Sequence, residues 1–360
     1  MAPVMAPVTA PRSYRVVALP GEGVGPEVVE ASLRILGAIA AAEGFTVAVD
    51  QGWIGEPARQ RFGTALPEET LRLCEGADGI VFGAVTQGGL LELRQRFDLF
   101  TNLRPVCPSP SLRQASPIKA DRLAEVDLLF VRELVSGIYF GPSGRGANAQ
   151  NACGGDYGFH TMRYADAEIR RVARVALGLA QSRRQHLTVA HKENALPHIP
   201  WTRLVKEVAL EFPDVVVMPM LVDNLAMQLV MQPRAFDVIL AGNLFGDILS
   251  DLGGAIAGSI GLLGSASLNA DGFGLYEPVH GTAPDIAGKG IANPLGTLAA
   301  VVLMLEQWGE RQAAQQLTAV QEKLLADGDR PTDLYQNEPG TRRVTTFELV
   351  DHFIKAIQSG

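Results

Sequence analysis

Short apolar runs alternate with amphipathic segments along most of this 360-residue chain. Turn residues bound the runs, as they bound buried β-strands. The apolar runs cover residues 14–19, 45–49, 79–85, 126–131, 187–190, 215–218 and 236–241, and the clearest amphipathic segment covers residues 167–183. This alternation predicts an α/β fold whose large, mostly parallel sheet is covered by helices.

A glycine-rich turn, Gly21-Glu-Gly-Val-Gly25, follows the first expected strand, and Pro26 then opens a helix that ends near Gly44. With Asp50 at the end of the next strand, the turn resembles the dinucleotide-binding turn of Rossmann folds. The third glycine of that motif, which allows close packing of helix and strand, should stand where Pro26 is. A simple strand–helix turn is therefore preferred, and the sequence predicts a fold other than the Rossmann fold.

Composition narrows the class of protein. A net charge of −8 lacks the basic surface that nucleic acid requires. Residues 295–305 are too short an apolar stretch to cross a bilayer, and the first dozen residues are expected to be a frayed tail, not a signal peptide. Three cysteines, Cys74, Cys107 and Cys153, fit neither a disulfide framework nor a zinc site. We therefore expect a cytoplasmic protein with no membrane and no nucleic acid among its partners.

Two aspartates, Asp247 and Asp251, stand four residues apart and so share one face of an expected helix. Like charges at this spacing destabilise a helix, and a divalent cation would remove that cost. Carboxylate oxygens suit Mg²⁺ or Mn²⁺, and Asp223 in a second acidic turn could complete the site. The alternative is that the two side chains begin a helix and face water.

Three arginines, Arg94, Arg104 and Arg132, are candidates for binding carboxylates, because a guanidinium group can donate two parallel hydrogen bonds. Arg132 follows an expected strand, and the carboxyl ends of strands line the crevice of open α/β sheets. Leu90 and Leu91 precede Arg94, so one segment could offer both an apolar contact and a charge. Solvated arginines and core leucines are the alternative.

Tyr139 and Lys192 each follow a strand-like run. A tyrosine can donate a proton, and a lysine with a lowered pKa can accept one, although a tyrosine among apolar residues can also be part of the core. A third candidate is the turn-rich segment of residues 277–294, which shows neither strand nor helix periodicity. Loops of this length inside a compact domain are usually functional.

Together these segments resemble the 3-isopropylmalate dehydrogenase family, whose kin act on isocitrate, homoisocitrate, tartrate and D-malate. The resemblance runs from residue 19 to about 305, and its most specific blocks are residues 132–141, 222–251 and 275–294. It implies NAD-dependent oxidative decarboxylation of a 3-substituted malate, with 3-isopropylmalate and leucine biosynthesis favoured, and a Mg²⁺ or Mn²⁺ ion.

The resemblance also implies a two-lobed fold. Residues 1–106 and 259–360 would form a first lobe with both termini and the cofactor loop. Residues 107–258 would form a central dimerisation lobe with an arm at about 141–160. The partner would be a second copy, in a homodimer with shared active sites to which the partner chain brings its own Lys192 and Asp223.

Each candidate residue receives a role from this resemblance. Tyr139 and Lys192 would be catalytic, and Asp223, Asp247 and Asp251 would bind the metal. The substrate would contact Leu90, Leu91, Arg94, Arg104, Arg132, Ala195 and Asp223. The cofactor would contact His280, Gly281, Ala283, Asp285, Ile286 and Asn293. A carboxylate at Asp285 favours NAD, because it would repel the 2′-phosphate of NADP.

Three departures from the family concern the active site. The loop before Leu90 is shorter, Gln87 replaces a glutamate expected near the nicotinamide, and Ala195 replaces a valine that helps to enclose the isopropyl group. A malate with a larger C3 group, such as benzyl or a long alkyl chain, is therefore an alternative substrate. A non-catalytic regulatory subunit is the alternative from another class, but Tyr139, Lys192 and the three aspartates are all present.

Overall fold

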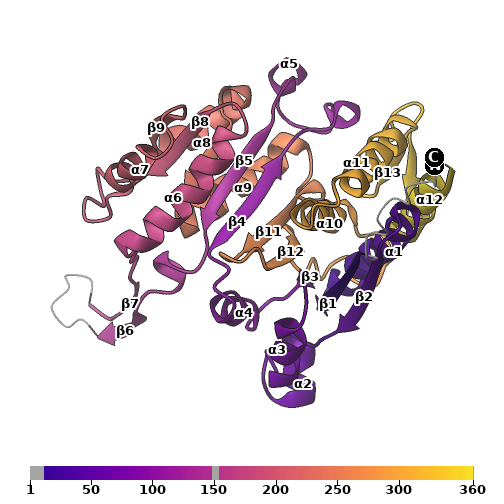
Figure 1. Cartoon of the computed structure of the whole chain (residues 1–360), viewed down its shortest axis with the longest axis horizontal. Coiled ribbons are helices and arrows are strands. Elements are labelled where there is room, and N and C mark those ends of the chain that lie inside the picture. The colour runs from indigo at the N-terminus through magenta and orange to yellow at the C-terminus, as the bar shows by residue number, and fades with distance from the viewer. Residues whose placement is uncertain (1–11, 148–153, 360) are drawn as a thin grey trace, which may run out of the picture.

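The computed structural model of the protein describes residues 12–147 and 154–359. Its centre is a ten-stranded sheet in which strands from distant parts of the chain are neighbours (Figure 1). From one edge to the other the strands are β2 (Thr46–Gln51), β1 (Ser13–Gly21), β3 (Gly79–Ala84), β12 (Gly274–Pro278), β11 (Gly264–Leu268), β4 (Thr101–Val106), β5 (Leu128–Glu133), β10 (Val238–Ala241), β8 (His186–His191) and β9 (Val216–Leu221).

The sheet is parallel towards both edges and antiparallel in the middle. Strands β2, β1, β3 and β12 pair in parallel, and so do β5, β10, β8 and β9. Strand β11 is antiparallel to β12 and β4, and β4 is antiparallel to β5. The prediction of a large, mostly parallel sheet is confirmed. Strands β4, β11 and β12 escaped prediction because their short sequences mix polar and apolar residues, and the segment from Glu277 therefore begins in a strand and not in a loop.

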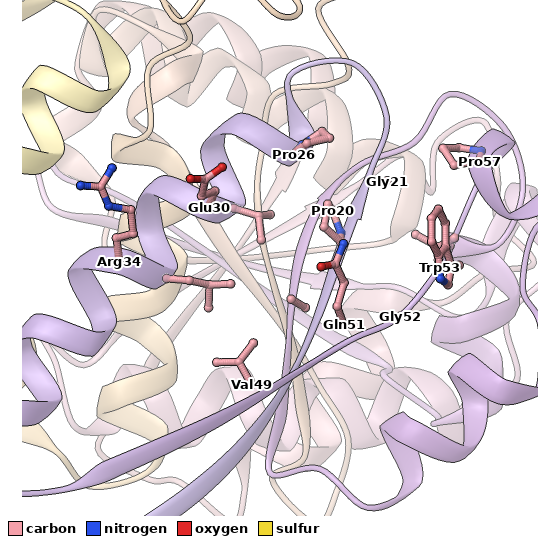
Figure 2. A pocket seen from close by; sticks show the side chains of 14 residues that line it. Pro20, Gly21, Pro26, Glu30, Arg34, Val49, Gln51, Gly52, Trp53 and Pro57 are labelled. Carbon is pink, nitrogen blue, oxygen red and sulfur yellow. The ribbon is translucent and has the colours of Figure 1, made fainter.

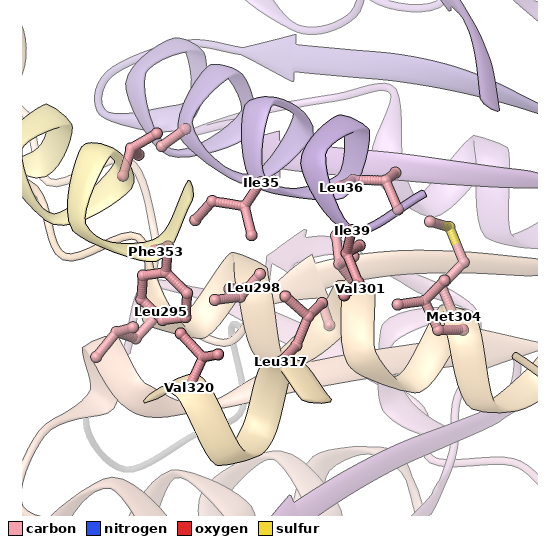
Figure 3. Packing of buried hydrophobic residues seen from close by; sticks show 14 of the residues in the cluster. Ile35, Leu36, Ile39, Leu295, Leu298, Val301, Met304, Leu317, Val320 and Phe353 are labelled. Carbon is pink, nitrogen blue, oxygen red and sulfur yellow. The ribbon is translucent and has the colours of Figure 1, made fainter. Parts of the chain in front are cut away.

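Alternate side chains of β1 and β3 enter two different hydrophobic cores, because successive strand residues point to opposite faces. Val16 and Val81 belong to a core formed with the helices near the two ends of the chain. Figure 3 shows this core, with Ile35, Leu298 and Phe353 among its labelled side chains. Val17 and Phe82 belong to the core on the opposite face. The first set of helices is α1 (Gly25–Glu43), α10 (Leu295–Gln307), α11 (Arg311–Ala326) and α12 (Thr346–Ser359), and the second face holds α3 (Glu68–Glu75) and α4 (Leu90–Arg96), preceded by α2 (Glu56–Phe62).

The other half of the sheet repeats this arrangement. Val131 and Leu240 pack with α6 (Asp166–Gln181) and α7 (Trp201–Ala209) on one face. Phe130 and Ile239 pack with α8 (Val222–Met231) and α9 (Asn243–Ala257) on the other. The short elements are α5 (Ala120–Leu123), the 3₁₀ turns Pro110–Leu112, Gly137–Tyr139, Pro233–Ala235 and Ile260–Leu262, and the paired strands β13 (Asp329–Pro331) and β14 (Arg342–Val344).

The segment expected to be an arm contains an antiparallel strand pair, β6 (Ser143–Ala147) and β7 (Asp156–His160), which projects from the central part of the chain (Figure 1). Residues 148–153 of the expected arm lie outside the described residues, as do residues 1–11 of the expected tail. Within the described residues, no helix is both long and apolar enough to cross a membrane, and residues 295–305 lie in α10.

Candidate active site

A pocket of about 300 Å³ lies at the carboxyl ends of β3, β5 and β12, beside the beginning of α4 and the first turns of α9. Carboxyl ends of strands are where ligands bind in sheets of this class. The pocket brings together residues that the sequence places far apart. Those that were predicted to be functional are Leu90, Leu91, Arg94, Arg104, Arg132, Tyr139, Asp247, His280 and Gly281.

Arg132 lies near the end of β5, with only 2% of its surface exposed. Its Nε and Nη2 atoms donate to Oδ1 of Asn243 at 3.2 and 2.8 Å, and Nη1 donates to Oδ1 of Asp247 at 2.5 Å. Burial, together with the nearby positive charge of Arg104, lowers the pKa of Arg132 to about 10. The guanidinium group therefore stays charged at neutral pH, and its plane is fixed before any ligand arrives.

Arg104 lies in β4, which is antiparallel to β5, so its guanidinium group reaches the same pocket. Its Nε donates to Oδ1 of Asn102 at 2.9 Å. Its Nη1 donates to Ser250 Oγ at 2.8 Å and to Asp251 Oδ1 at 2.9 Å. Both partners on α9 therefore hold this side chain beside the acidic face of that helix.

Arg94 forms a buried ion pair that the sequence analysis did not anticipate. Its Nη2 lies 2.6 Å from Oε1 of Glu277 in β12, and the two side chains are 8% and 7% exposed. Removing one member of such a pair would leave an uncompensated buried charge. The signal for Glu277 was its place at the start of the turn-rich segment, but only the pairing of β12 with β3 brings it to Arg94.

Tyr139 ends the 3₁₀ turn that follows β5 and is 40% exposed. Its hydroxyl donates to Oδ2 of Asp247 at 3.0 Å. Burial, and then the negative charge of Asp247, raise the pKa of Tyr139. The phenol is therefore protonated at neutral pH and faces the pocket as a proton donor.

Asp247 and Asp251 lie one turn apart on α9, as their spacing predicted. Asp247 accepts from Arg132 and Tyr139, Asp251 accepts from Arg104, and burial raises the pKa of Asp251. Neither carboxylate simply faces water. Their oxygen atoms are the hard ligands that Mg²⁺ and Mn²⁺ prefer, so this pair fits a share of a metal site.

Lys192, Asp223 and Ala195 do not line this pocket. Lys192 follows β8, and its Nζ lies 2.9 Å from Oδ2 of Asp223 at the start of α8, where the ammonium lowers the pKa of that aspartate. Ala195 is exposed nearby. Across residues 12–147 and 154–359, no three His, Cys, Asp or Glu side chains are placed to hold a metal ion. Of the three expected metal ligands, Asp247 lines the pocket, Asp251 lies one turn further along α9, and Asp223 of the same chain lies elsewhere.

The charges at the pocket balance. Three arginines face three carboxylates, which belong to Asp247, Asp251 and Glu277. A dicarboxylate and a divalent cation also sum to zero charge, so together they could enter without leaving a net buried charge. The arrangement suits a substrate that carries two carboxylates and binds with a metal ion.

A second pocket, of about 260 Å³, adjoins the first through His280, which lines both. It contains four of the predicted cofactor residues, His280, Ala283, Ile286 and Asn293. Burial lowers the pKa of His280, which favours the neutral imidazole. Gly281 lines the first pocket, and Asp285 is exposed outside the lining of either pocket. The walls of this second pocket are formed largely by apolar side chains.

The glycine-rich turn packs against the loop that lines the second pocket. The N–H of Val24 donates to the carbonyl oxygen of Thr282 at 2.9 Å. Gly23 has φ +64°, and a Cβ there would lie only 2.0 Å from the same oxygen. The turn that resembles a dinucleotide-binding motif thus requires glycine because another backbone segment touches it.

Glu27, on the first turn of α1, holds the far part of that loop. Its carboxylate accepts from the N–H of Gly290 at 3.2 Å and of Ala292 at 2.8 Å, and also from the Thr346 hydroxyl. These hydrogen bonds hold the backbone at residues 290–292 in place, and Ile291 and Ala292 of this segment line the second pocket. Asn293 is fixed as well, since its amide donates to Asp333 at 3.1 Å.

A further cavity, of about 740 Å³, is a groove between α1 and β2 (Figure 2). None of the predicted site residues lines it. Asp50, which a Rossmann site would use to bind ribose, instead accepts from Arg15 Nε at 2.7 Å and lies outside the lining. The groove is therefore separate from the chemistry described above.

Comparisons with known proteins agree with this geometry. Residues 15–353 match the model of a family described as isocitrate/isopropylmalate dehydrogenase. The chain is 44% identical to a 3-isopropylmalate dehydrogenase of Halalkalibacterium halodurans, over 96% of this chain and 98% of that protein. It is 40% identical to the 3-isopropylmalate dehydrogenase of Aquifex aeolicus, with the same two coverages.

Solved structures give the same result. An isocitrate dehydrogenase from Methylococcus capsulatus superposes with a TM-score of 0.85 at 31% identity, covering 96% of this chain and 99% of that one. A β-decarboxylating dehydrogenase from Thermococcus kodakarensis has a TM-score of 0.77 at 33% identity, covering 96% of both chains. By sequence, architecture and site geometry, the chain belongs to the isocitrate/isopropylmalate dehydrogenase family.

Proposed function

We propose that this chain catalyses the NAD-dependent oxidative decarboxylation of 3-isopropylmalate to 4-methyl-2-oxopentanoate, a step of leucine biosynthesis. The observation that carries this proposal is the pocket in which three buried arginines and Tyr139 lie beside Leu90 and Leu91. The relatives named 3-isopropylmalate dehydrogenase support it and favour neither a bulkier malate nor a regulatory subunit. A cytoplasmic location, expected from the cysteines, belongs to the same proposal.

The substrate-binding groups follow from the charges. Arg94, Arg104 and Arg132 would hold the carboxylate that leaves as CO₂, because a guanidinium group binds a carboxylate through two hydrogen bonds. Leu90 and Leu91 would contact the isopropyl group, and a homoisocitrate or isocitrate substrate would place a further carboxylate against these apolar side chains. Ala195 of the partner subunit would form the more distant wall.

Asp247 and Asp251, with Asp223 of the partner subunit, would bind Mg²⁺ or Mn²⁺. When bound, such an ion polarises the oxygen at C2 of the substrate. That the ion is Mg²⁺ or Mn²⁺ is part of this proposal.

Proton transfers would belong to two side chains. Lys192 of the partner subunit would accept the proton of the C2 hydroxyl while the hydride at C2 passes to NAD⁺. Loss of CO₂ leaves an electron pair on C3, and Tyr139 would protonate that carbon. The raised pKa of Tyr139 suits a donor that must be protonated at neutral pH.

NAD would lie along the second pocket, against His280, Gly281, Ala283, Ile286 and Asn293. His280, as a neutral imidazole, could stack on the adenosine part of the cofactor. Asp285 would accept hydrogen bonds from the ribose hydroxyls and disfavour NADP. The adjacency of the two pockets at His280 supports hydride transfer between their contents.

We further propose two lobes, residues 1–106 with 259–360 and residues 107–258, and a homodimer formed through the second lobe. Exposed apolar side chains on α8, the edge strand β9 and α9 support this proposal, because a monomer would leave them in water. They are Val216, Met218, Met227, Val230, Met231 and Ile248, each 41–58% exposed.

The substrate is tested by NADH formation with Mg²⁺, comparing kcat/KM for 3-isopropylmalate, 3-benzylmalate and D-malate. We expect 3-isopropylmalate to be preferred. Preference for 3-benzylmalate would instead assign the chain to side-chain extension, and activity with none of the three would reject the proposed function. Leu90→Ala should change the ranking of the substrates, and an unchanged ranking would contradict the pocket assignment.

Shared active sites are tested by mixing two inactive variants, Lys192→Ala and Asp247→Asn. If each site combines Lys192 of one subunit with Asp247 of the other, mixed dimers contain one intact site and part of the activity returns. If both residues act within one chain, no exchange of subunits restores activity. Each variant by itself, taken through the same mixing procedure, is the control.

A further inference from the structure

We propose that Asn243 is a positioning residue that fixes Arg132 and Tyr139 relative to one another. The inference rests on the proposed function, because it assigns those two side chains to substrate binding and proton donation. Asn243 is fully buried at the first residue of α9, outside the set of residues that resemblance placed in the site.

The side-chain oxygen of Asn243 fixes the plane of the Arg132 guanidinium group. It accepts hydrogen bonds from both Nε and Nη2 of Arg132, at 3.2 and 2.8 Å. The remaining nitrogen, Nη1, is thereby turned towards the pocket, where it reaches Asp247. A guanidinium group only donates hydrogen bonds, so the oxygen of the amide must face it.

The side-chain nitrogen of Asn243 fixes the turn that leads to Tyr139. It donates to the carbonyl oxygens of Leu134 at 3.1 Å and Ser136 at 2.9 Å. These residues lie between the end of β5 and the 3₁₀ turn that Tyr139 ends. The amide thus uses both its donors and both its acceptor positions. Its orientation is fixed because its oxygen must face the guanidinium group and its nitrogen must face the two carbonyl oxygens.

The two groups that Asn243 positions meet at one carboxylate. Arg132 Nη1 and the Tyr139 hydroxyl bind the two oxygens of Asp247 at 2.5 and 3.0 Å. A displacement of either element would therefore change the geometry at the point where the leaving carboxylate and the proton donor must coincide. Such misplacement is costly even when the chemical groups are unchanged.

Two substitutions separate the roles of the amide. Asn243→Asp keeps the oxygen that faces Arg132 but loses the donors to the turn. It should lower kcat by roughly 10–100-fold with little change in KM for 3-isopropylmalate. Asn243→Ser reaches neither partner and should lower kcat and also raise KM. Asn337→Asp, at an exposed asparagine far along the chain, is the matched control and should change neither.

A double-mutant cycle distinguishes positioning from a general loss of stability. In a Tyr139→Phe background, Asn243→Asp should cause little further loss of kcat, because the residue through which it acts is already disabled. If the two losses multiply, or if Asn243→Asp and Asn243→Ser change kcat and KM identically, the inference is wrong. If the aspartate variant does not fold, Asn243→Ser takes its place in the cycle: KM should still rise through Arg132, while kcat should fall less in the Tyr139→Phe background than in the wild type. Wild-type activity on 3-isopropylmalate is the positive control, and its absence would reject the proposed function instead.

Discussion

The two adjoining pockets are built in opposite ways. The first is built around three almost completely buried arginines, and each guanidinium group is bound to a carboxylate. The second is formed by small apolar side chains on a loop, and the polar groups that hold this loop lie behind it on α1. The difference indicates where specificity resides.

In the first pocket, specificity depends on which side chains are present, because each buried charge is compensated by a particular neighbour. In the second pocket, specificity depends on the shape of the backbone. The loop there presents main-chain groups and small residues, and the glycine-rich turn and Glu27 fix its position. Substitutions in the first pocket should therefore affect catalysis strongly. Substitutions that support the second should affect cofactor binding moderately and leave the chemical step intact.

The largest effect is expected for Arg132→Lys. An ammonium group keeps the charge but cannot make the paired contacts to Asn243 and Asp247, so kcat/KM should fall roughly 10³-fold, about 4 kcal/mol. Arg96→Lys is the control, because Arg96 is exposed on α4 and pairs with Glu75. Steady-state kinetics would contradict the comparison if both variants lost activity to the same extent.

Glu133, next to Arg132 at the end of β5, makes the stability of the fold depend on pH. Burial raises its pKa to about 7 from 4.5, and its oxygens accept from the N–H of Val135 and Ser136, both at 3.1 Å. Between these two values the folded state keeps a proton that the unfolded chain has lost. The contribution of this group to stability therefore falls as pH rises through that window, by up to roughly 3 kcal/mol, and is constant above it.

Glu133→Gln has no such titration. The melting temperature of the wild type minus that of the variant should thus decrease between about pH 5 and pH 8. Parallel melting curves over that range would show that Glu133 does not titrate there. Glu69→Gln, at an exposed glutamate on α3, serves as the control.

A moderate effect confined to the cofactor is expected for Glu27→Gln. The variant loses one acceptor for the N–H groups of Gly290 and Ala292, so KM for NAD should rise roughly 10-fold while kcat stays near the wild-type value. Glu30→Gln, one turn along α1 in the groove of Figure 2, should leave both constants unchanged. If KM rose for the malate and not for NAD, Glu27 would support the first pocket, and its assignment to the cofactor pocket would be wrong.

The smallest effect is expected for Asp285→Ser. The exposed carboxylate repels a 2′-phosphate only through water, so its loss should raise kcat/KM for NADP by roughly 5-fold relative to NAD. The gain should shrink at high ionic strength, since salt screens exposed charges. Asp271→Ser, at an exposed aspartate in the turn between β11 and β12, is the control. An unchanged preference would remove Asp285 from the cofactor site.

Much of the fold could be predicted because its signals are local. The alternation of apolar runs indicated the parallel strands, and the helix from Pro26 ends at Gly44 in the left-handed conformation, as expected. The acidic pair on α9 followed from the helical repeat alone. The strands β4, β11 and β12 were missed because their short sequences carry buried polar residues such as Asn102, Ser267 and Glu277, so they form no continuous apolar run.

The sequence by itself determined the residue types of the site and the helix and strand ends that carry most of them, because these depend on short-range periodicity and turn chemistry. Only the tertiary structure determined which of these side chains contact one another. The pairing of Arg94 with Glu277, the contacts of Asn243 with both Arg132 and the turn before Tyr139, and the packing of Gly23 against Thr282 all join distant segments. Such contacts arise from sheet order and burial, which no local pattern records.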